Sequence, residues 1–294
     1  MAYLLTTTLI WAFSFGLIGH QLQGLNPLLI AALRLLTALL VFLPLLRKAR
    51  LTGAERGRLL WIGGVQFGVM YVAYISAFQF IPSHLVALFS VLTPLYVVLI
   101  HDLQRRKLNR AYLGAAALSV CGASVIRVSG SAGGEFWTGF ALMQLSGLAF
   151  AYGQVAYRDW KQQRPNVKDH EIFAWLYAGG AAVATIALLG TTRDPAALFE
   201  ISGQQLGLVV YLGAVASGLG FFLWNKGATR CSAGVLAAFN NALVPLAVAA
   251  SLFVFGEIEE TSRAEMLRLA IGAALIALAV LFGKCGTGPG TARP

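Results

Sequence analysis

Few residues within the long apolar stretches of this chain have side chains that could bind a solute. Asn240 and Asn241 stand out, because each amide offers donors and an acceptor and both lie within about a turn of Pro245. Their amides could satisfy backbone groups that the proline leaves without partners, or they could bind a zwitterion. A Phe-Ser pair at 89–90 stands in the matching place before Pro94. One side of such a site would be apolar and the other hydrogen-bonding, which suits an amphiphilic solute.

Other polar side chains are scattered along the apolar stretches, and each has two interpretations. Arg34 lies about two turns into its stretch, where it could snorkel toward the interface or pair with carbonyls, or bind the carboxylate of a substrate. His84 begins another stretch and could cap a helix or line an outer vestibule. Four glutamines could join neighbouring helices or contact the solute: Gln66, Gln79, Gln144 and Gln154.

Aromatic side chains recur at helical spacing along several stretches. Trp11 and Phe15 share one helix face, as do Tyr71, Tyr74 and Phe78. Such rings either face lipid or line a cavity, in which a tyrosine hydroxyl can bond to water or substrate. The predicted substrate-binding residues combine these rings with the polar groups: Trp11, Phe15, Tyr71, Tyr74, Phe78, His84, Ser90, Gln154, Trp224, Phe239, Asn240 and Asn241.

Two prolines interrupt long apolar stretches and are predicted hinges. Pro94 and Pro245 would each remove one helical hydrogen bond and displace the carbonyl four residues earlier. In hydrocarbon that carbonyl needs protein or a watery cavity to receive it. Two matched interruptions, one in each half of the chain, indicate a transport site between structural repeats.

The composition is that of a membrane protein. Only 12% of the 294 residues are charged, 58% are hydrophobic and the mean hydropathy is +0.72, whereas soluble domains carry about 25% charged residues. The net charge of +10 comes from basic residues in short breaks between apolar stretches, which indicates contact with an anionic leaflet rather than with nucleic acid. The three cysteines lack the spacing of a disulfide framework or a zinc site, and we expect no metal and no cofactor.

Windows of about 20 apolar residues predict ten membrane spans. They cover residues 2–20, 28–46, 59–80, 84–101, 111–127, 136–157, 171–190, 205–226, 232–255 and 267–283. With the N-terminus inside, seventeen Lys and Arg residues fall on the cytoplasmic side and four on the other. Since cytoplasmic loops carry the excess of basic residues, we expect both termini in the cytoplasm and the protein in the inner cell membrane.

Five spans in each half make the second half cross the membrane in the opposite sense. Pro94 and Pro245 are 151 residues apart, and an offset of 150 pairs Tyr74 with Trp224. These echoes favour an all-α integral membrane protein whose ten transmembrane helices form a 5+5 inverted repeat. The expected parts are a first repeat at 1–130, a second at 131–283 and a disordered cytoplasmic tail at 284–294.

Several short motifs are distributed over nearly the whole chain. They are residues 87–94 (ALFSVLTP), 237–245 (AAFNNALVP), 255–257 (FGE), 9–15 (LIWAFSF) and 32–34 (ALR). This set resembles the drug/metabolite transporter superfamily, in particular its EamA-type ten-helix exporters. The aromatic-rich helices look most like the aromatic amino acid exporters of the YddG type. The chain departs from the family at residues 101–102, where His-Asp stands in place of the common Gly-Glu.

The function expected from these features is transport rather than catalysis. No Asp or Glu falls inside the core of a predicted span, since Glu171 stands at a span end, and this argues against proton-coupled drug export. The chain also has no phosphate-binding loop for ATP. The leading hypothesis is an exporter of small amphiphilic metabolites, most of all aromatic or large neutral amino acids, working by alternating access as uniport or exchange. A transporter of another metabolite (nucleoside, nucleotide-sugar or neutral drug) and a passive channel remain as alternatives. The expected partners are a small-molecule substrate and membrane lipid, with no nucleic acid, and the protein is expected to be a monomer.

Overall fold

The computed structural model is helical throughout the residues that it describes, with no strand among them. These residues are 2–48, 51–104, 118, 121–122, 125, 134–191, 201–229, 243–244, 246–256 and 262–285. The helices are α1 (Ala2–Gly16), η1 (Leu17–Gln21), α2 (Pro27–Phe42), η2 (Leu43–Lys48), α3 (Gly53–Gly63), η3 (Gly64–Val69), α4 (Met70–Ala77), α5 (Ser83–Phe89), η4 (Ser90–Leu92), α6 (Thr93–Gln104), α8 (Gly134–Gln163), η5 (Asp169–Glu171), α9 (Phe173–Thr191), α10 (Gly203–Tyr211), η7 (Leu212–Leu219), α11 (Gly220–Ala228), η8 (Ala250–Val254) and α13 (Arg263–Cys285).

Five continuous helices are long and apolar enough to cross a membrane. They are Ala2–Gln21, Pro27–Leu46, Gly53–Ala77, Phe173–Thr191 and Gly203–Ala228. These helices confirm the predicted all-α membrane fold. The predicted spans at 84–101, 136–157 and 267–283 lie on α5–α6, α8 and α13. Most of the span at 111–127 and half of the span at 232–255 lie outside the described residues, so the count of ten stays a prediction. At the end of the chain, α13 includes Lys284 and Cys285, the first two residues of the predicted tail.

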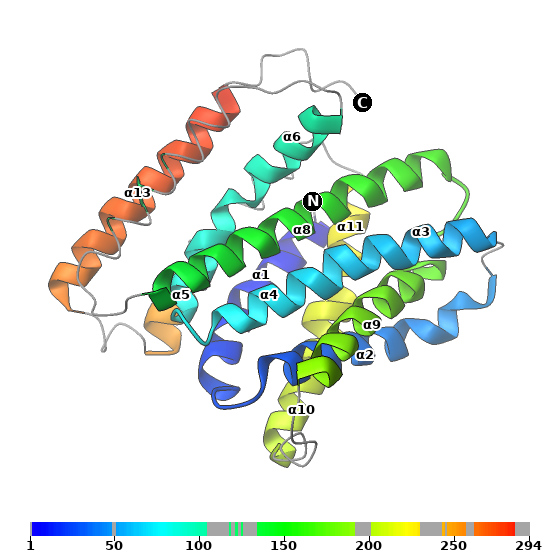
Figure 1. Ribbon diagram of the computed structural model, residues 1–294, viewed down its shortest axis with the longest axis horizontal. Helices are drawn as coiled ribbons and strands as arrows, with labels where there is room; N and C mark the ends of the chain where they lie inside the picture. Colours follow the sequence, from blue (N-terminus) through cyan, green and yellow to red (C-terminus); the bar gives the residue numbers. More distant parts are fainter. Residues whose placement is uncertain are drawn as a thin grey trace.

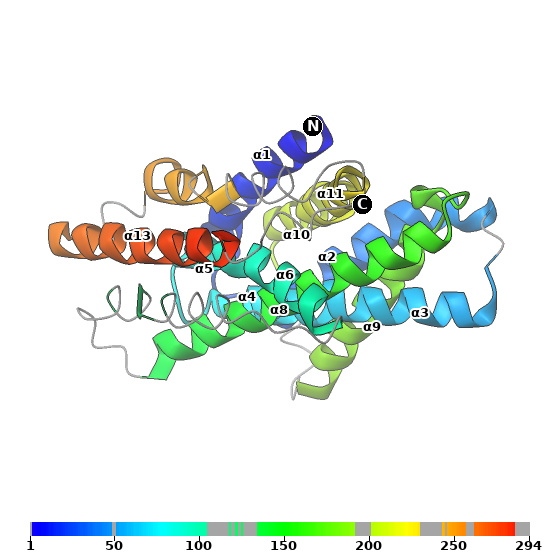
Figure 2. The same cartoon turned by 90° about the horizontal axis from the view of Figure 1, so that it is seen from above.

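The helices lie in two neighbouring groups (Figure 1). At one end α2 and α3 both pack against α9, and at the other end α13 lies beside α6 (Figures 1 and 2). The long helix α8 passes between these groups and packs against both α4 and α6. Helices from distant parts of the sequence therefore meet in the middle, where α1 also packs against α11.

Glycines set the closest of these contacts. A Cβ atom at Gly63 would collide with the Leu176 carbonyl, and one at Gly179 would collide with the Leu60 carbonyl. α3 and α9 thus touch backbone to backbone, which only small residues permit within a membrane. These glycines therefore serve close packing of the two helices.

Several helices depart from α geometry near the middle of the bundle. π-helical turns occupy η3 and η7, which lie at positions related by the offset of about 150 residues seen in the sequence. This correspondence supports the hypothesis of two repeats. The stretch before Pro94 tightens into the 3-10 turn η4, in which the Thr93 N–H donates to the Ser90 carbonyl. That bond satisfies the carbonyl which a proline four residues later leaves without its usual partner.

Candidate functional site

A small cavity lies where the helices meet. Its volume is about 90 Å³, less than the roughly 300–1,000 Å³ of most ligand pockets. A metabolite-sized ligand therefore requires a wider state of the protein. The lining combines aromatic, apolar and hydroxyl side chains with one cation: Trp11, Ser14, Phe15, Arg34, Met70, Tyr71, Tyr74, Ser90, Thr93, Met143, Ser146, Gly147, Phe150, Phe221 and Leu243.

Arg34 is the charged group of this cavity, and α2 places it there. Asn26 caps α2 by accepting a hydrogen bond from the Leu28 N–H at 2.9 Å, and Pro27 occupies the first turn, where a missing N–H costs nothing. Arg34 follows about 10 Å further along the helix axis. Only 2% of its surface is exposed. The side chain is therefore buried in the bundle and does not snorkel to the interface.

Two hydroxyl groups hold the guanidinium. Arg34 Nε donates to Ser217 Oγ at 3.2 Å, and Arg34 Nη2 donates to Tyr71 Oη at 3.0 Å. The Tyr71 and Ser217 hydroxyls are 2.8 Å apart, and Ser217 Oγ donates to the Leu212 carbonyl at 3.1 Å. Because Ser217 has only one proton to donate, Tyr71 is the donor in its bond to Ser217. These neutral partners orient the guanidinium without neutralising it.

The π-helical turn η7 brings Ser217 to this position. Gly213 lets η7 approach α2, since a Cβ there would lie 3.0 Å from the Arg34 carbonyl. The irregular turn also exposes carbonyls that side chains of other helices satisfy. Trp11 Nε1 donates to the Ala216 carbonyl at 2.8 Å, and Tyr177 Oη lies 2.7 Å from the Gly218 carbonyl. The π-helical turn therefore positions both Ser217, which binds the Arg34 guanidinium, and Trp11, whose ring lines the cavity.

One guanidinium nitrogen is left without a partner. Arg34 Nη1 is buried and accepted by no group among the described residues, and no carboxylate in that part of the chain pairs with Arg34. A cation buried without a counter-ion is costly, by several kcal/mol even after relaxation. A carboxylate is the complementary group, because it can accept charge-assisted hydrogen bonds from a guanidinium fork. The arrangement is thus suited to an anion in the cavity.

The structure gathers some of the predicted site residues and leaves others apart. Trp11, Phe15, Tyr71, Tyr74 and Ser90 line the cavity. The other described candidates lie outside its lining: Phe78, whose ring packs on Tyr74, the buried His84 in the first turn of α5, and the buried Gln154 and Trp224. Phe239, Asn240, Asn241 and Pro245 lie outside the described residues, so their predicted roles are untested. Pro94 is the second residue of α6, directly after Thr93 of the lining.

Several lining residues were not among the predicted ones. One wall of the cavity comes from α8, where the lining residues follow the i, i+3, i+4, i+7 spacing of one helix face: Met143, Ser146, Gly147 and Phe150. That spacing could have identified these four residues as one helix face from the sequence alone. For Ser217 the only sequence signal was its place in a run of small residues, since its contact with Arg34 depends on the π-helical turn.

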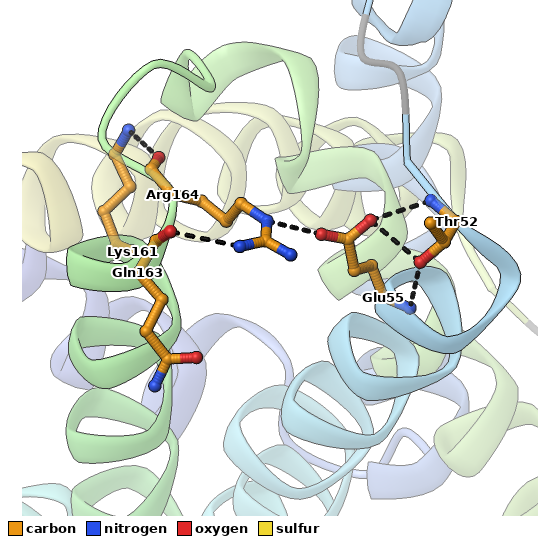
Figure 3. Close-up of polar contacts among 5 residues, drawn as sticks. All are labelled: Thr52, Glu55, Lys161, Gln163 and Arg164. Atoms are coloured by element: carbon orange, nitrogen blue, oxygen red, sulfur yellow. Dashed lines mark hydrogen bonds and ion pairs between the residues drawn. The ribbon is translucent and has the colours of Figure 1, made fainter.

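An ion pair joins two helix ends (Figure 3). Arg164 Nε lies 2.5 Å from Glu55 Oε1, which links the segment after α8 to the first turn of α3. The other Glu55 oxygen accepts from the Thr52 N–H at 2.8 Å, while Thr52 Oγ1 accepts from the Glu55 N–H at 3.3 Å. This capping box fixes the carboxylate in place for the arginine.

Comparisons with known proteins agree with this architecture. Residues 1–128 match the EamA-like transporter family. A biotin transporter of Escherichia coli strain K12 is 40% identical over 259 residues, which are 87% of this chain and 85% of its own. A probable biotin transporter of Pseudomonas aeruginosa is 39% identical over 288 residues, covering 97% and 98% of the two chains. A crystal structure 21% identical in sequence shares the fold, with a TM-score of 0.63 over 97% of this chain and 96% of its own. The chain is a multi-pass membrane transporter rather than an enzyme, and it belongs to the EamA-like transporter family of the drug/metabolite transporter superfamily.

Proposed function

We propose that this protein transports biotin or a closely similar monocarboxylate, with Arg34 binding the carboxylate. The observation that carries the proposal is the buried Arg34 guanidinium, whose Nη1 has no acceptor among the described residues while its other nitrogens are held by hydroxyls. Relatives that match most of the chain are named biotin transporters. Biotin carries one carboxylate on a hydrocarbon chain, so it combines the anion that Arg34 lacks with an apolar body that suits the cavity walls.

Amino acid export, the leading hypothesis from the sequence, has less support. No relative reported above is named an amino acid exporter, and no aromatic exporter of the YddG type is among them. An amino acid also carries an ammonium group, and the described lining of the cavity contains no carboxylate to pair with it. The alternative of another metabolite, kept open by the sequence, fits these observations better.

The transport mechanism remains the one expected from the sequence. We infer alternating access as uniport or exchange, by a monomer in the inner membrane with both termini in the cytoplasm. The small cavity supports this mechanism, because a carrier must pass through states in which its site is closed around little or no free space. The excess of basic residues on one side of the predicted spans supports the orientation.

Uptake by proteoliposomes tests the proposal. Wild-type protein is expected to take up radiolabelled biotin with saturation and with stimulation by unlabelled biotin on the opposite side, as a carrier does and a channel does not. Replacing Arg34 by Gln should weaken biotin binding by about 10- to 150-fold, because a hydrogen bond to a charged group contributes about 1.5–3 kcal/mol. Arg58→Gln, at an exposed arginine in the middle of α3, is the matched control and should leave binding unchanged.

Neutral biotinamide separates recognition of charge from recognition of shape. It should compete poorly with biotin in wild-type vesicles and should gain relative to biotin in Arg34→Gln. Equal competition by biotin and biotinamide in the wild type, or unchanged biotin affinity in Arg34→Gln, would refute the assignment of Arg34. Phenylalanine transport at the rate of biotin would return the amino acid hypothesis to first place.

A further inference from the structure

A second group of polar side chains is buried beyond the cavity. Gln66 on η3, Gln154 on α8, and Trp224 and Asn225 on α11 are all at least nine-tenths buried, and we call them the amide cluster. η3 packs against α8 in the middle of the molecule, and α11 reaches η3 through Asn225 (Figure 1). Gln66 Nε2 lies 3.5 Å from Asn225 Oδ1, and a Cβ at Gly153, next to Gln154, would collide with the Gln66 side chain. Gln66 therefore contacts Asn225 and packs against α8 directly beside Gln154, while Trp224 precedes Asn225 in the chain.

Most of the hydrogen-bonding capacity of this cluster is unused. Gln66 Oε1, both amide atoms of Gln154 and Trp224 Nε1 are buried and have no partner among the described residues. They supply two acceptors and two donors. Each such group left unpaired costs about 1–3 kcal/mol, so glutamines that served only to join helices would be expected to pair with one another. Exchanging the amide ends of Gln154 changes nothing, because both ends lack partners.

The cluster lies about one helical turn beyond the cavity on three helices. Gln154 follows the lining residue Phe150 by four positions, and Trp224 follows the lining residue Phe221 by three. Gln66 precedes the lining residue Met70 by four positions. These intervals correspond to about 4.5–6 Å of helix rise. α8 runs antiparallel to η3 and α4, because Gly153 lies against Gln66 whereas Gly139 lies against Phe80. The three offsets therefore point to the same side of the cavity.

Aromatic rings separate the two polar regions. Trp11 contacts Phe221 with ring centroids 4.8 Å apart and Phe150 at 6.1 Å, and the rings of Phe150 and Phe221 are 5.6 Å apart. We call these three rings the aromatic layer. On its other side, the ring centroids of Trp11 and Trp224 are 5.0 Å apart. A solute that passes between the layer's rings would leave the Arg34 cavity and meet the amide cluster.

We propose that the amide cluster is a second binding site, which recognises a cyclic urea or a neutral head group with the same donors and acceptor. This inference rests on the proposed function, because biotin carries a cyclic urea at the end opposite its carboxylate. The two urea N–H groups match the free oxygens of Gln66 and Gln154, and the urea carbonyl matches the free N–H groups of Gln154 and Trp224. Arg34 and the amide cluster would then bind opposite ends of one solute, on either side of the aromatic layer.

Competition between biotin and lipoate tests this site. Lipoate has a carboxylate on a hydrocarbon chain, but its cyclic head is a disulfide without a urea. In wild-type proteoliposomes unlabelled biotin should inhibit labelled biotin uptake far better than lipoate does. Gln154→Leu should raise the half-inhibiting concentration of biotin about tenfold, because one or two neutral hydrogen bonds are lost, while that of lipoate stays unchanged. The control is Gln144→Leu on the same helix, whose glutamine pairs with Tyr96 outside the cluster.

The outcomes separate this inference from the proposed function. If Gln154→Leu weakens inhibition by biotin and by lipoate equally, or weakens neither, the amide cluster does not recognise the head group and the inference is wrong. If wild-type protein takes up no biotin, the proposed function is wrong, and the cluster is tested with imidazolidin-2-one, a cyclic urea without a carboxylate. That probe should raise the unfolding temperature of the wild type and not of Gln154→Leu, and no shift in the wild type would overturn the inference. Trp224→Phe, which keeps the ring and removes only the N–H, guards against a Leu variant that fails to fold.

Discussion

Replacing Tyr71 by Phe removes one oxygen from the middle of the binding site. Tyr71 Oη accepts from Arg34 Nη2 at 3.0 Å and bonds to Ser217 Oγ at 2.8 Å. Phenylalanine keeps the ring, whose centroid lies 4.8 Å from the Arg34 guanidinium carbon, so the cation–π contact survives. Ser217 also keeps the bond from Arg34 Nε. The one group that loses its partner is Arg34 Nη2, which joins Nη1 as an unpaired buried donor.

The expected loss of stability follows from that donor. A buried group left unsatisfied costs about 1–3 kcal/mol, with charged groups at the upper end. Tyr71→Phe should therefore lower the free energy of unfolding in detergent by that amount when no substrate is present. Biotin should recover part of the loss, since its carboxylate can accept from both free nitrogens in the bidentate arrangement that guanidinium favours. The stabilisation by saturating biotin should thus be larger in the variant than in the wild type.

Unfolding measured with and without biotin tests this reasoning. Tyr211→Phe removes the same oxygen from a tyrosine that is 51% exposed, and it should change neither stability nor the biotin effect. If Tyr71→Phe unfolds like the wild type, the hydrogen bond to Arg34 contributes nothing. If biotin stabilises the variant less than the wild type, the carboxylate does not bind at Arg34.

Three further changes test other parts of the structure. Gly63→Ala forces a Cβ against the backbone of α9 and should cost about 1–3 kcal/mol of stability, measured as detergent unfolding, whereas Gly57→Ala, with open space around it, should be neutral or stabilising. Trp11→Phe removes the donor to a carbonyl of η7 and should cost about 1–3 kcal/mol while keeping the aromatic layer; an unchanged unfolding curve would contradict this. Arg164→Gln breaks the half-exposed ion pair with Glu55, and because exposed pairs contribute at most about 1 kcal/mol, the unfolding midpoint should stay near that of the wild type; a clearly larger loss of stability would contradict this.

Hydropathy was enough to predict the class of fold, because long apolar stretches in a lipid environment have few alternatives to helices. Helical spacing also placed Trp11, Phe15, Tyr71 and Tyr74 on faces that line the cavity. These inferences depend on periodicities within a single helix. They required no knowledge of which helices become neighbours.

The role of Arg34 could not be decided in this way. Snorkelling and carboxylate binding differ only in what surrounds the side chain, and its partners Tyr71 and Ser217 are distant in sequence. Ser217 reaches Arg34 through a π-helical turn that shifts its helix face, and no residue pattern marked that turn. Trp224 shows a different limit of sequence reasoning. The repeat offset placed it deep in the bundle, as observed, but its ring lies behind Trp11 and away from the cavity lining.

The glycine contact between α3 and α9 has a mechanical consequence for transport. Where two backbones already touch, neither helix can move closer, so the relative motion left to α3 and α9 at this contact is a change of crossing angle. The two halves of the chain can change their relative orientation about this α3–α9 contact, and α13 and α6 lie at the opposite end of the molecule (Figure 1). A small tilt at Gly63 and Gly179 would therefore be amplified into a wide displacement at that distant edge.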